Sequence, residues 1–338
     1  MKKFIYAIIT AVAVLLTSCH DAPDYSSTSA TDTFDCLWET LDTRYCYFGE
    51  KGVDWDAIGE RYRKRIIPGI NSEELFRLCA QMLNELRDGH VNLSTPFAQS
   101  YFREWWTAYP QDFDYRTVQQ YYLGFDYLSI GSIDYKILPS NIGYIRYPSF
   151  SYIPGEGNLD YMFNYLAVCD AVIIDIRDNG GGEVTNIKPF VSRLIHEKMT
   201  GGYIRHKTGP GHDDFSEPYP VEYEPAKKGH IVWNKPVAVL TNRSCFSAAN
   251  DFVAVMKEVP GVIIVGARTG GGGGMPFNAE LPNGWRVRFS SSPMLDVSKR
   301  SIEDGIDPTP GCEAHSPAEE LAAGKDGILD RAIELLTK

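Results

Sequence analysis

The sequence predicts an α/β fold in which a mostly parallel β-sheet is covered by helices. Residues 171–182 and 237–252 each begin as an apolar β-type run, break into a glycine or polar turn, and continue in a helix-like pattern. Strand-like runs at residues 142–147 and 262–265 extend this alternation, with helical stretches between them. Such alternation favours parallel strands, because the connecting helices cover the faces of the sheet. The turns that follow the strands should therefore meet at the carboxyl edge of one sheet.

The chain begins with a segment that is typical of an export signal. Lys2 and Lys3 precede an apolar run over residues 4–16, which is too short to span a bilayer and leads into Leu-Thr-Ser-Cys at Cys19. A cysteine after small residues is similar to the bacterial lipoprotein cleavage box, which implies lipid on Cys19 and removal of residues 1–18. An ordinary signal peptide is the alternative. We expect an exported lipoprotein that faces the periplasm or the cell surface and is anchored in the bacterial envelope, with the outer membrane favoured.

Composition limits what the exported part can be. Residues 19–32 are small and polar without periodicity, which suits a flexible tether. The rest of the 338 residues is enough for one large domain or for a core with a smaller module. A formal net charge of −11 argues against a nucleic-acid partner, because phosphate binding draws on basic surface. The seven cysteines lack the spacing of a zinc site or a disulfide framework, and we expect neither a metal nor a cofactor. Cys79 and Cys169 fall in apolar patterns typical of a core.

Residues 33–96 are expected to form an N-terminal helical module. Apolar side chains recur at helical spacing between residues 34 and 48, and a second helix-like stretch covers residues 58–66. A third begins at residues 70–74 (INSEE), a pattern that indicates a helix start. The helices end at residues 87–90 (RDGH), which a short strand-like alternation follows.

The rest of the chain divides into a connector and a core. Residues 97–141 form an aromatic-rich connector, in which residues 124–137 alternate like a hairpin, and residues 142–338 form the α/β core. Within the core, residues 200–233 are rich in proline and glycine, which predicts a loop-rich insertion that borders the site. Five glycines at residues 270–274 are no phosphate loop, since no Lys-Ser or Lys-Thr follows them; we expect a mobile wall of a substrate cleft.

Two of the turns carry groups suited to acyl transfer. The glycine turn at residues 180–182 offers bare backbone amides, and the turn after the strand at residues 237–240 offers serine hydroxyls. A hydroxyl that attacks a carbonyl needs nearby donors that stabilise the resulting oxyanion. The two turns together therefore predict a serine hydrolase.

Seven short segments occur in a fixed order over most of the chain after residue 33. They are Trp38 with Asp54 and Trp55, and residues 86–90 (LRDGH), 142–146 (IGYIR), 175–182 (DIRDNGGG), 240–249 (LTNRSCFSAA), 266–269 (GART) and 303–308 (EDGIDP). In this order they resemble the tail-specific, or C-terminal processing, serine peptidases, and within that family the tricorn-like and retinoid-binding-protein-like branch. The resemblance implies a ββα core akin to the crotonase and Clp protease folds.

By this resemblance the nucleophile falls on Ser247, at the start of a predicted helix. The chemistry agrees, because the free amides and the positive dipole end of a helix N-terminus favour a developing negative charge. Serine is also a frequent N-cap residue, so a purely structural role for Ser247 is the alternative, and Ser244 is the second candidate for the nucleophile. For the oxyanion hole we expect the amide of Ala248 and one from Gly180 or Gly181.

A serine hydroxyl needs a base that removes its proton. The processing branch uses a lysine, but the corresponding position here is Gly272, so the Ser-Lys mechanism is excluded in its usual form. The tricorn-like branch uses a histidine in the matching Asp-Gly-His segment, which makes His90 the general base. The family's orienting acid falls on Glu303. Because Gly89 stands where the tricorn-like enzymes carry a bridging serine, the link from Glu303 to His90 would be direct, run through water, or be replaced by Asp88.

The sequence thus predicts an exported, lipid-anchored serine endopeptidase that cleaves peptides or unfolded protein segments through an acyl-enzyme. The connector is too short for the PDZ module that the processing branch inserts at this place. Two alternatives stay open: a catalytically inactive peptide- or lipid-binding protein on the same fold, and a thioester-converting enzyme, against which acidic charge and export argue. Because a charged imidazole cannot accept the serine proton, we expect hydrolysis to fall as the pH is lowered from about 8 to 5.

Overall fold

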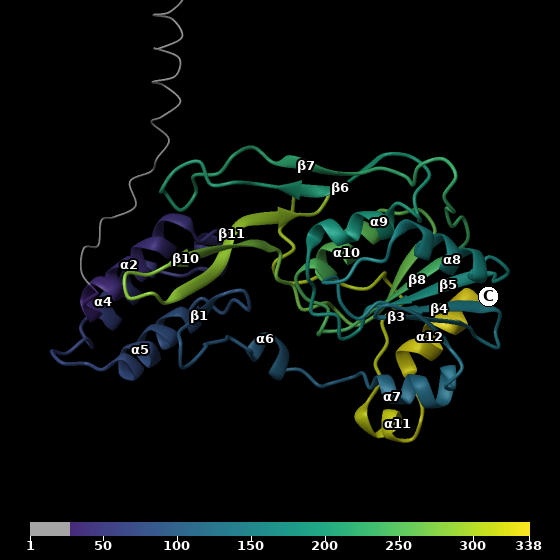
Figure 1. Ribbon diagram of the computed structural model, residues 1–338, viewed down its shortest axis with the longest axis horizontal. Coiled ribbons are helices and arrows are strands. Elements are labelled where there is room, and N and C mark those ends of the chain that lie inside the picture. The colour runs from purple at the N-terminus through teal and green to yellow at the C-terminus, as the bar shows by residue number, and fades with distance from the viewer. Residues whose placement is uncertain (1–27) are drawn as a thin grey trace, which may run out of the picture.

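Two β-sheets follow each other along the long axis of the molecule (Figure 1). The computed structural model describes residues 28–338, so the predicted signal peptide, Cys19 and most of the predicted tether lie outside the described residues. The larger sheet has six strands in the order β2-β3-β4-β5-β8-β9. These are β2 (Leu128–Ile130), β3 (Ile133–Ile137), β4 (Ile142–Arg146), β5 (Ala171–Asp175), β8 (Val237–Thr241) and β9 (Val262–Gly266). β4, β5, β8 and β9 are parallel, and β2 and β3 form the hairpin predicted for residues 124–137.

The second sheet is antiparallel and joins the N-terminal part of the chain to the core. Its central strand is β11 (Arg286–Leu295), which pairs with β1 (Asn92–Ser94), β10 (Gly274–Glu280) and β6 (Met199–Ile204). β6 pairs in turn with β7 (Tyr219–Tyr223) and forms a two-stranded ribbon. Through the β1–β11 pairing, the segment that follows the N-terminal helices is held against a strand from the C-terminal half.

Helices cover both faces of the six-stranded sheet. α8 (Glu156–Leu166), α9 (Ile187–Val191) and α10 (Ala248–Met256) pack on one face, and α12 (Gly327–Leu336) packs on the other. All five residues of β5 are buried, as expected for a parallel strand that is covered on both faces. The predicted α/β fold class is therefore confirmed.

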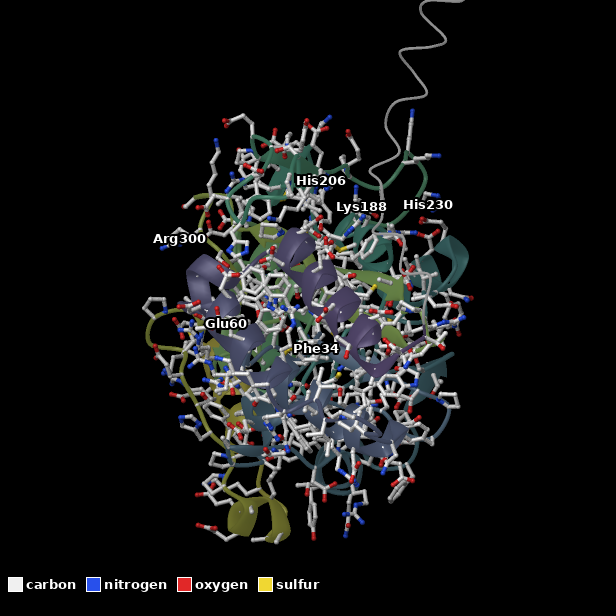
Figure 2. The ribbon with its side chains drawn as sticks, turned by 90° about the vertical axis from the view of Figure 1, so that its left-hand side faces the viewer. Phe34, Glu60, Lys188, His206, His230 and Arg300 are labelled. Carbon is white, nitrogen blue, oxygen red and sulfur yellow. The ribbon has the colours of Figure 1, made fainter. Side chains whose placement is uncertain are left out.

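The N-terminal helices form their own hydrophobic cluster at one end of the molecule. They are α2 (Ala30–Arg44), α3 (Phe48–Lys51), α4 (Trp55–Arg63) and α5 (Ser72–Asn84). Figure 2 views the molecule from this end, with Phe34 labelled on α2, and Phe34 shares the cluster with Phe289 of β11. Asn71 and Glu74 form the capping box that starts α5, as the sequence indicated. α2 begins at Ala30, so the end of the predicted tether belongs to its first turn.

Short helical segments complete the chain. They are α6 (Glu104–Thr107), α7 (Tyr115–Val118), a π-helical turn (Gln119–Leu123), a 3-10 turn (Val184–Asn186) and α11 (Ala318–Ala322). The six cysteines that the structure describes form no disulfide, and Cys79 and Cys169 are fully buried. Within residues 28–338, no helix combines the length and the hydropathy that a bilayer span requires. In the same range, no group of three histidine, cysteine or acidic side chains is placed to hold a metal ion.

Four strands go beyond what the sequence pattern predicted. β6 and β7 lie in or beside the predicted loop-rich insertion, and β10 and β11 follow the glycine run. β11 shows no clear apolar alternation because Ser290 takes a fully buried position, where its hydroxyl bonds to Asp88 at 2.9 Å. The helix predicted for residues 184–196 ends as α9 at Val191.

Candidate active site

The two residues predicted for proton transfer lie together where the two sheets meet. Ser247 stands between β8 and α10, and His90 precedes β1, so the two come from different sheets and are 157 residues apart in the chain. His90 Nε2 lies 3.0 Å from Ser247 Oγ, which is hydrogen-bonding distance. Ser244, the second candidate for the nucleophile, instead accepts a hydrogen bond from Trp106 Nε1 at 2.7 Å. The structure thus brings Ser247, and not Ser244, to the histidine.

Ser247 has an unusual backbone conformation. Its angles are φ 58° and ψ −125°, a region that residues with side chains rarely adopt and that costs about 1–3 kcal/mol. The Ser247 N–H donates to the carbonyl oxygen of Gly271 at 2.9 Å. On the other side of the turn, a Cβ added to Gly181 would lie 2.8 Å from the Ser247 Cβ. Neighbours therefore fix the turn on both sides. The hydroxyl makes no capping bond to α10 and is presented to His90 instead.

The glycine run at residues 270–274 is buried beside Ser247. Gly272 N–H donates to the carbonyl oxygen of Glu303 at 2.9 Å, and a Cβ on Gly271 would lie 1.8 Å from that same oxygen. Side chains are absent here because two turns approach each other closely. The run is an interior packing element, which corrects the expectation of a cleft wall.

Two of the predicted oxyanion donors, Ala248 and Gly181, lie beside Ser247 but differ in how free their amides are. Ala248 is the first residue of α10, where a helix leaves its amides without an intrahelical partner. Gly181 borders the same spot, since a Cβ there would lie 2.9 Å from the Ala248 nitrogen. However, Gly181 N–H already donates to Asn179 Oδ1 at 2.9 Å, so the expectation that Gly181 offers a free amide is corrected. A Cβ on Gly180 would meet nothing within 4 Å, which leaves the space in front of this residue open.

Burial keeps His90 neutral. The residue is 2% exposed, and loss of hydration lowers the pKa of its imidazole to about 4, although the nearby Asp88 carboxylate acts in the opposite direction. The ring packs against Phe246 with centroids 4.8 Å apart. Nδ1 is buried and has no hydrogen-bond partner. A neutral His90 can take a proton on Nε2, but the hydrogen that Nδ1 then carries has no acceptor.

Neither predicted acid accepts a hydrogen bond from the His90 ring. Glu303 is buried, with Lys51 Nζ 2.8 Å from its Oε1 and the Gly273 N–H donating to its Oε2 at 2.9 Å. The direct link from Glu303 to His90 is therefore corrected: the carboxylate is turned toward the lysine. Asp88 contacts His90 only through the backbone, where it accepts the His90 N–H at 2.7 Å.

Asp88 and Glu303 share a buried cluster with residues that the sequence did not reveal. Asp88 Oδ2 accepts hydrogen bonds from Tyr45 OH at 3.0 Å and from Ser290 Oγ at 2.9 Å. Burial, followed by the Asp88 charge, raises the pKa of Glu303 to about 8. Lys51 ends the four-residue α3 without any motif around it, so no signal in the sequence could have marked its role.

An aromatic pair explains why glycine precedes His90. Trp105 stacks on Phe246 with ring centroids 4.2 Å apart, and a Cβ on Gly89 would lie 2.6 Å from Trp105 Nε1. The serine found at this position in tricorn-like enzymes would therefore clash with the indole. The departure from the family pattern follows from local packing between the connector and the nucleophile turn.

Comparisons with known proteins agree with this geometry. Residues 141–310 match Peptidase family S41, and residues 28–84 match the Tricorn protease C1 domain. The crystal structure of a candidate peptidase from Parabacteroides merdae is 44% identical, covers 92% of this chain and 97% of its own, and superposes with a TM-score of 0.86. Mature CPAF is 13% identical with a TM-score of 0.66, covering 92% of this chain and 98% of its own, which shows a shared fold.

More distant relatives match only part of their length. A candidate tricorn-like protease C-terminal subunit from Sulfurisphaera tokodaii is 29% identical over 210 residues, which is 58% of this chain and 21% of that protein. The chain spans between 10% and 21% of the length of the curated relatives that it matches. The S41 match covers half of the chain, and the Parabacteroides merdae structure is similar over nearly its whole length. The resemblance seen in the seven segments is confirmed, and the chain belongs to peptidase family S41, a family of serine-type peptidases.

Proposed function

We propose that the chain is a serine endopeptidase that cleaves peptides or unfolded protein segments through an acyl-enzyme, with Ser247 as nucleophile and His90 as general base. The observation that carries the proposal is the 3.0 Å contact between His90 Nε2 and Ser247 Oγ. The strained backbone of Ser247 adds support, because a residue that only caps a helix does not need it. Membership in family S41 points the same way.

The reaction would begin with proton transfer. Neutral His90 takes the Ser247 proton on Nε2 while the serine oxygen attacks the substrate carbonyl, whose electron pair moves onto its oxygen. The N–H groups of Ala248 and Gly180 stabilise this oxyanion. The imidazolium then gives its proton to the leaving amine, and an ester remains on Ser247. Water attacks the ester with His90 again as base, which releases the acid and restores the serine.

The Asp88 carboxylate stabilises the positive charge that His90 gains in this step. The Asp88 carboxylate accepts the backbone N–H of His90, and Tyr45 and Ser290 hold its other oxygen in place. A fixed negative charge beside the ring favours the imidazolium in a buried setting. Glu303 would contribute only through the charge balance of the cluster, since Lys51 holds it.

A fluorophosphonate probe tests the proposal directly. We expect the folded protein to be labelled on Ser247, and Ser247→Ala to lose both labelling and peptide hydrolysis by on the order of 10⁴-fold or more. Ser244→Ala is the matched control, because it removes a hydroxyl from the same turn that contacts Trp106 instead of His90. It should still be labelled. A folded native chain that stays unlabelled would contradict the proposal.

A catalytically inactive peptide- or lipid-binding protein on the same fold is the second candidate. Two observations favour it: His90 Nδ1 has no acceptor, and Glu303 is bound to Lys51. In that case the native chain and Ser247→Ala should bind an unstructured peptide with equal affinity, and neither should release product. Calorimetric titration followed by mass spectrometry of the mixture separates the two candidates.

We also propose that Cys19 carries lipid and that the mature chain is anchored in the bacterial envelope, with the outer membrane favoured. The support is the pattern of residues 1–19, which lie outside the described residues. Cys19→Ser should move the protein from the membrane fraction to the soluble fraction. Cys36→Ser, which changes a free cysteine of α2, should leave it in the membrane fraction. A Cys19→Ser protein that stays with the membrane would rule out this anchor.

A further inference from the structure

Arg288 stands on β11, close to the proposed catalytic pair. β11 lies between the N-terminal helices and α10 (Figure 1), and its Phe289 packs into the hydrophobic cluster of those helices. The register of β11 is regular here, and successive side chains of a strand point to opposite faces, so Arg288 and Ser290 share the other face about 7 Å apart. The Ser290 hydroxyl bonds to Asp88. This face of β11 is therefore the one that meets the segment carrying His90.

Neighbouring strands add polar side chains to the same face. Asn92 of β1 and Asn278 of β10 are the residues paired with Arg288, and side chains of directly opposite residues lie on one face. Asn92 follows His90 by two residues, and its side-chain amide donates to the Val91 carbonyl oxygen at 3.0 Å. Asn278 is exposed. The face thus presents a guanidinium that two amide side chains flank.

Within residues 28–338, the half-buried Arg288 guanidinium has neither an ion-pair partner nor a hydrogen-bond acceptor. Burial lowers the pKa of this group, and the charges of Asp88 and Glu183 act in the opposite direction without contacting it. Arg286, two residues earlier on the same face, shows the contrast: it is exposed and paired with Glu280. Arg288 bears a loss of hydration that no partner in the described part of the chain compensates. The ligand that matches its planar fork of N–H donors is a carboxylate.

The electrostatic neighbours of Arg288 belong to both parts of the proposed site. Its positive charge lowers the pKa of His90, so the guanidinium lies within electrostatic range of the general base. Glu183, whose charge acts on Arg288, directly follows the glycine turn at residues 180–182. Arg288 therefore lies near the base and near the turn that is proposed to hold the oxyanion.

We infer that Arg288 binds a carboxylate of the peptide substrate within about three residues of the scissile bond. The inference rests on the proposed peptidase function and adds a substrate class to it. An extended peptide advances about 3.3 Å per residue, and Arg288 lies about 7 Å along β11 from the residue that is bonded to Asp88. The carboxylate is that of an aspartate or glutamate side chain or that of the substrate's C-terminus, since both present the same two oxygens to the guanidinium.

A bound carboxylate also assists the chemistry. His90 gains a positive charge when it takes the Ser247 proton, and the Arg288 guanidinium opposes that charge. A carboxylate on Arg288 neutralises the opposing charge while it anchors the peptide. The preference for a carboxylate should therefore appear in kcat as well as in KM.

Quenched peptides that differ by one residue test the inference on the full chain. A peptide without other charges carries either glutamate or glutamine at one position, and this position is moved through the three residues on each side of the cleaved bond, which mass spectrometry identifies. We expect glutamate at one of these positions to raise kcat/KM on the order of 10–10²-fold over glutamine.

Three variants assign this preference to Arg288. Arg288→Gln should reduce the glutamate-to-glutamine ratio to about one, and Arg288→Lys should retain part of it, because an ammonium group keeps the charge without the fork. Arg286→Gln is the matched control, since it removes an arginine from the same face that already has Glu280 as its partner. It should keep the native ratio.

A second set of peptides separates the two sources of the carboxylate. These peptides contain no acidic residue and end up to three residues after the cleaved bond, in either a free carboxylate or a carboxamide. A preference for the free carboxylate that Arg288→Gln removes assigns Arg288 to the C-terminus of the substrate. A preference confined to glutamate assigns it to an acidic side chain. Either result supports the inference.

Fluorophosphonate labelling separates failure of this inference from failure of the proposed function. If the native chain is labelled on Ser247 and cleaves both sets of peptides without a preference for a carboxylate, the inference is wrong and the peptidase stands. A preference that survives Arg288→Gln also overturns the inference. Should Arg288→Gln not fold, Arg288→Lys decides, and a ratio equal to the native one overturns the inference. If the folded native chain is not labelled at all, both are wrong.

Discussion

Two buried charge clusters in this molecule each contain two carboxyl groups and one lysine or arginine, and they hold these groups in opposite ways. In the first, called here the Arg177 cluster, the guanidinium reaches both acids. Its Nε and Nη2 donate to Asp175 at 2.9 and 2.7 Å, and its Nη1 donates to Asp326 at 2.8 Å. All three side chains are fully buried. This cluster ties the start of the glycine turn to the N-terminus of α12.

In the second, called here the His90 cluster, the basic group reaches only one acid. Lys51 contacts Glu303 at 2.8 Å, while Asp88 is held by the hydroxyls of Tyr45 and Ser290 and by the backbone N–H of His90. An ammonium group is a point charge, whereas a guanidinium is a fork that can serve two carboxylates at once. In the His90 cluster, the lysine therefore contacts only one of the two acids, and the other is held by neutral hydrogen-bond donors.

The pKa values show what the difference means. Burial acts to raise the pKa of Asp326, but the charge of Arg177 and the hydrogen bonds to the carboxylate hold it below the usual value. In the His90 cluster, burial and the Asp88 charge raise the pKa of Glu303 to about 8 in spite of Lys51. The Arg177 cluster keeps Asp326 ionised and supports the fold. The other keeps a titrating group close to the residue proposed to move protons.

The largest effect should come from the reactive member of the His90 cluster. His90→Gln should lower peptide hydrolysis by about 10²–10⁴-fold, because the base for Ser247 is lost. The free energy of unfolding should change little, since Nδ1 makes no hydrogen bond that could be lost. Steady-state kinetics and urea unfolding of the same preparation check this. A large loss of stability would give the His90 cluster the structural role that we assign to the Arg177 cluster.

A pair of variants compares the two basic residues. Arg177→Met should lower the free energy of unfolding by about 3–5 kcal/mol, because it leaves two buried carboxylates without a balancing positive charge. Lys51→Met should lower it by only about 1–2 kcal/mol, since the raised pKa of Glu303 keeps this acid largely protonated at pH 7, so that it loses a hydrogen-bond partner and not a balancing charge. Urea unfolding at pH 7 measures both. Equal losses would remove the distinction between the clusters.

The pH dependence of stability should reveal Glu303. Its folded pKa is raised from 4.5 to about 8, so its stabilising contribution is complete below pH 4.5 and is lost as the pH rises toward 8. Glu303→Gln should remove this decline, which we expect to be on the order of 1–3 kcal/mol between pH 5 and 8. Asp326→Asn is the control from the Arg177 cluster: the lowered pKa of Asp326 gives stability that is present at neutral pH and lost on acidification. A native decline that survives Glu303→Gln would have another origin.

The smallest effect is expected at the acidic end of the pH profile of fluorophosphonate labelling. Because burial lowers the pKa of His90 to about 4, the rate of fluorophosphonate labelling should fall only as the pH drops through about 4. Between pH 5 and 8 it should change by less than about twofold. This replaces the decline between pH 8 and 5 that an ordinary histidine would give. A midpoint near 6.5 would show that the His90 ring is hydrated in solution.

The sequence predicted those parts of the molecule that depend on local pattern. The buried run of β5 and the capping box at Asn71 follow from hydrophobic spacing and cap chemistry, and the structure has both. The proximity of His90 and Ser247 came from the family resemblance, because no local rule relates residues 157 positions apart. β11 escaped prediction because Ser290 is buried for a hydrogen bond rather than for its hydrophobicity.

The details of the site depended on contacts that only the folded chain creates. Whether the Gly181 amide is free depends on the side chain of Asn179, and whether Glu303 reaches His90 depends on Lys51. Each of these partners is a common polar residue in no recognisable motif. Residue types could therefore nominate the reacting groups, but they could not assign the hydrogen bonds that orient them.

His90 and Ser247 lie next to strands of different sheets, so the contact between them depends on how the two sheets are placed. His90 lies between the N-terminal helices and β1, whereas Ser247 lies between β8 and α10. A shift of one end of the molecule against the other by about an ångström would lengthen the 3.0 Å contact beyond hydrogen-bonding distance, with every helix and strand still intact. Proton transfer between His90 and Ser247 thus depends on how the two ends of the molecule pack against each other, and a measurement of secondary structure alone does not detect a change in that packing.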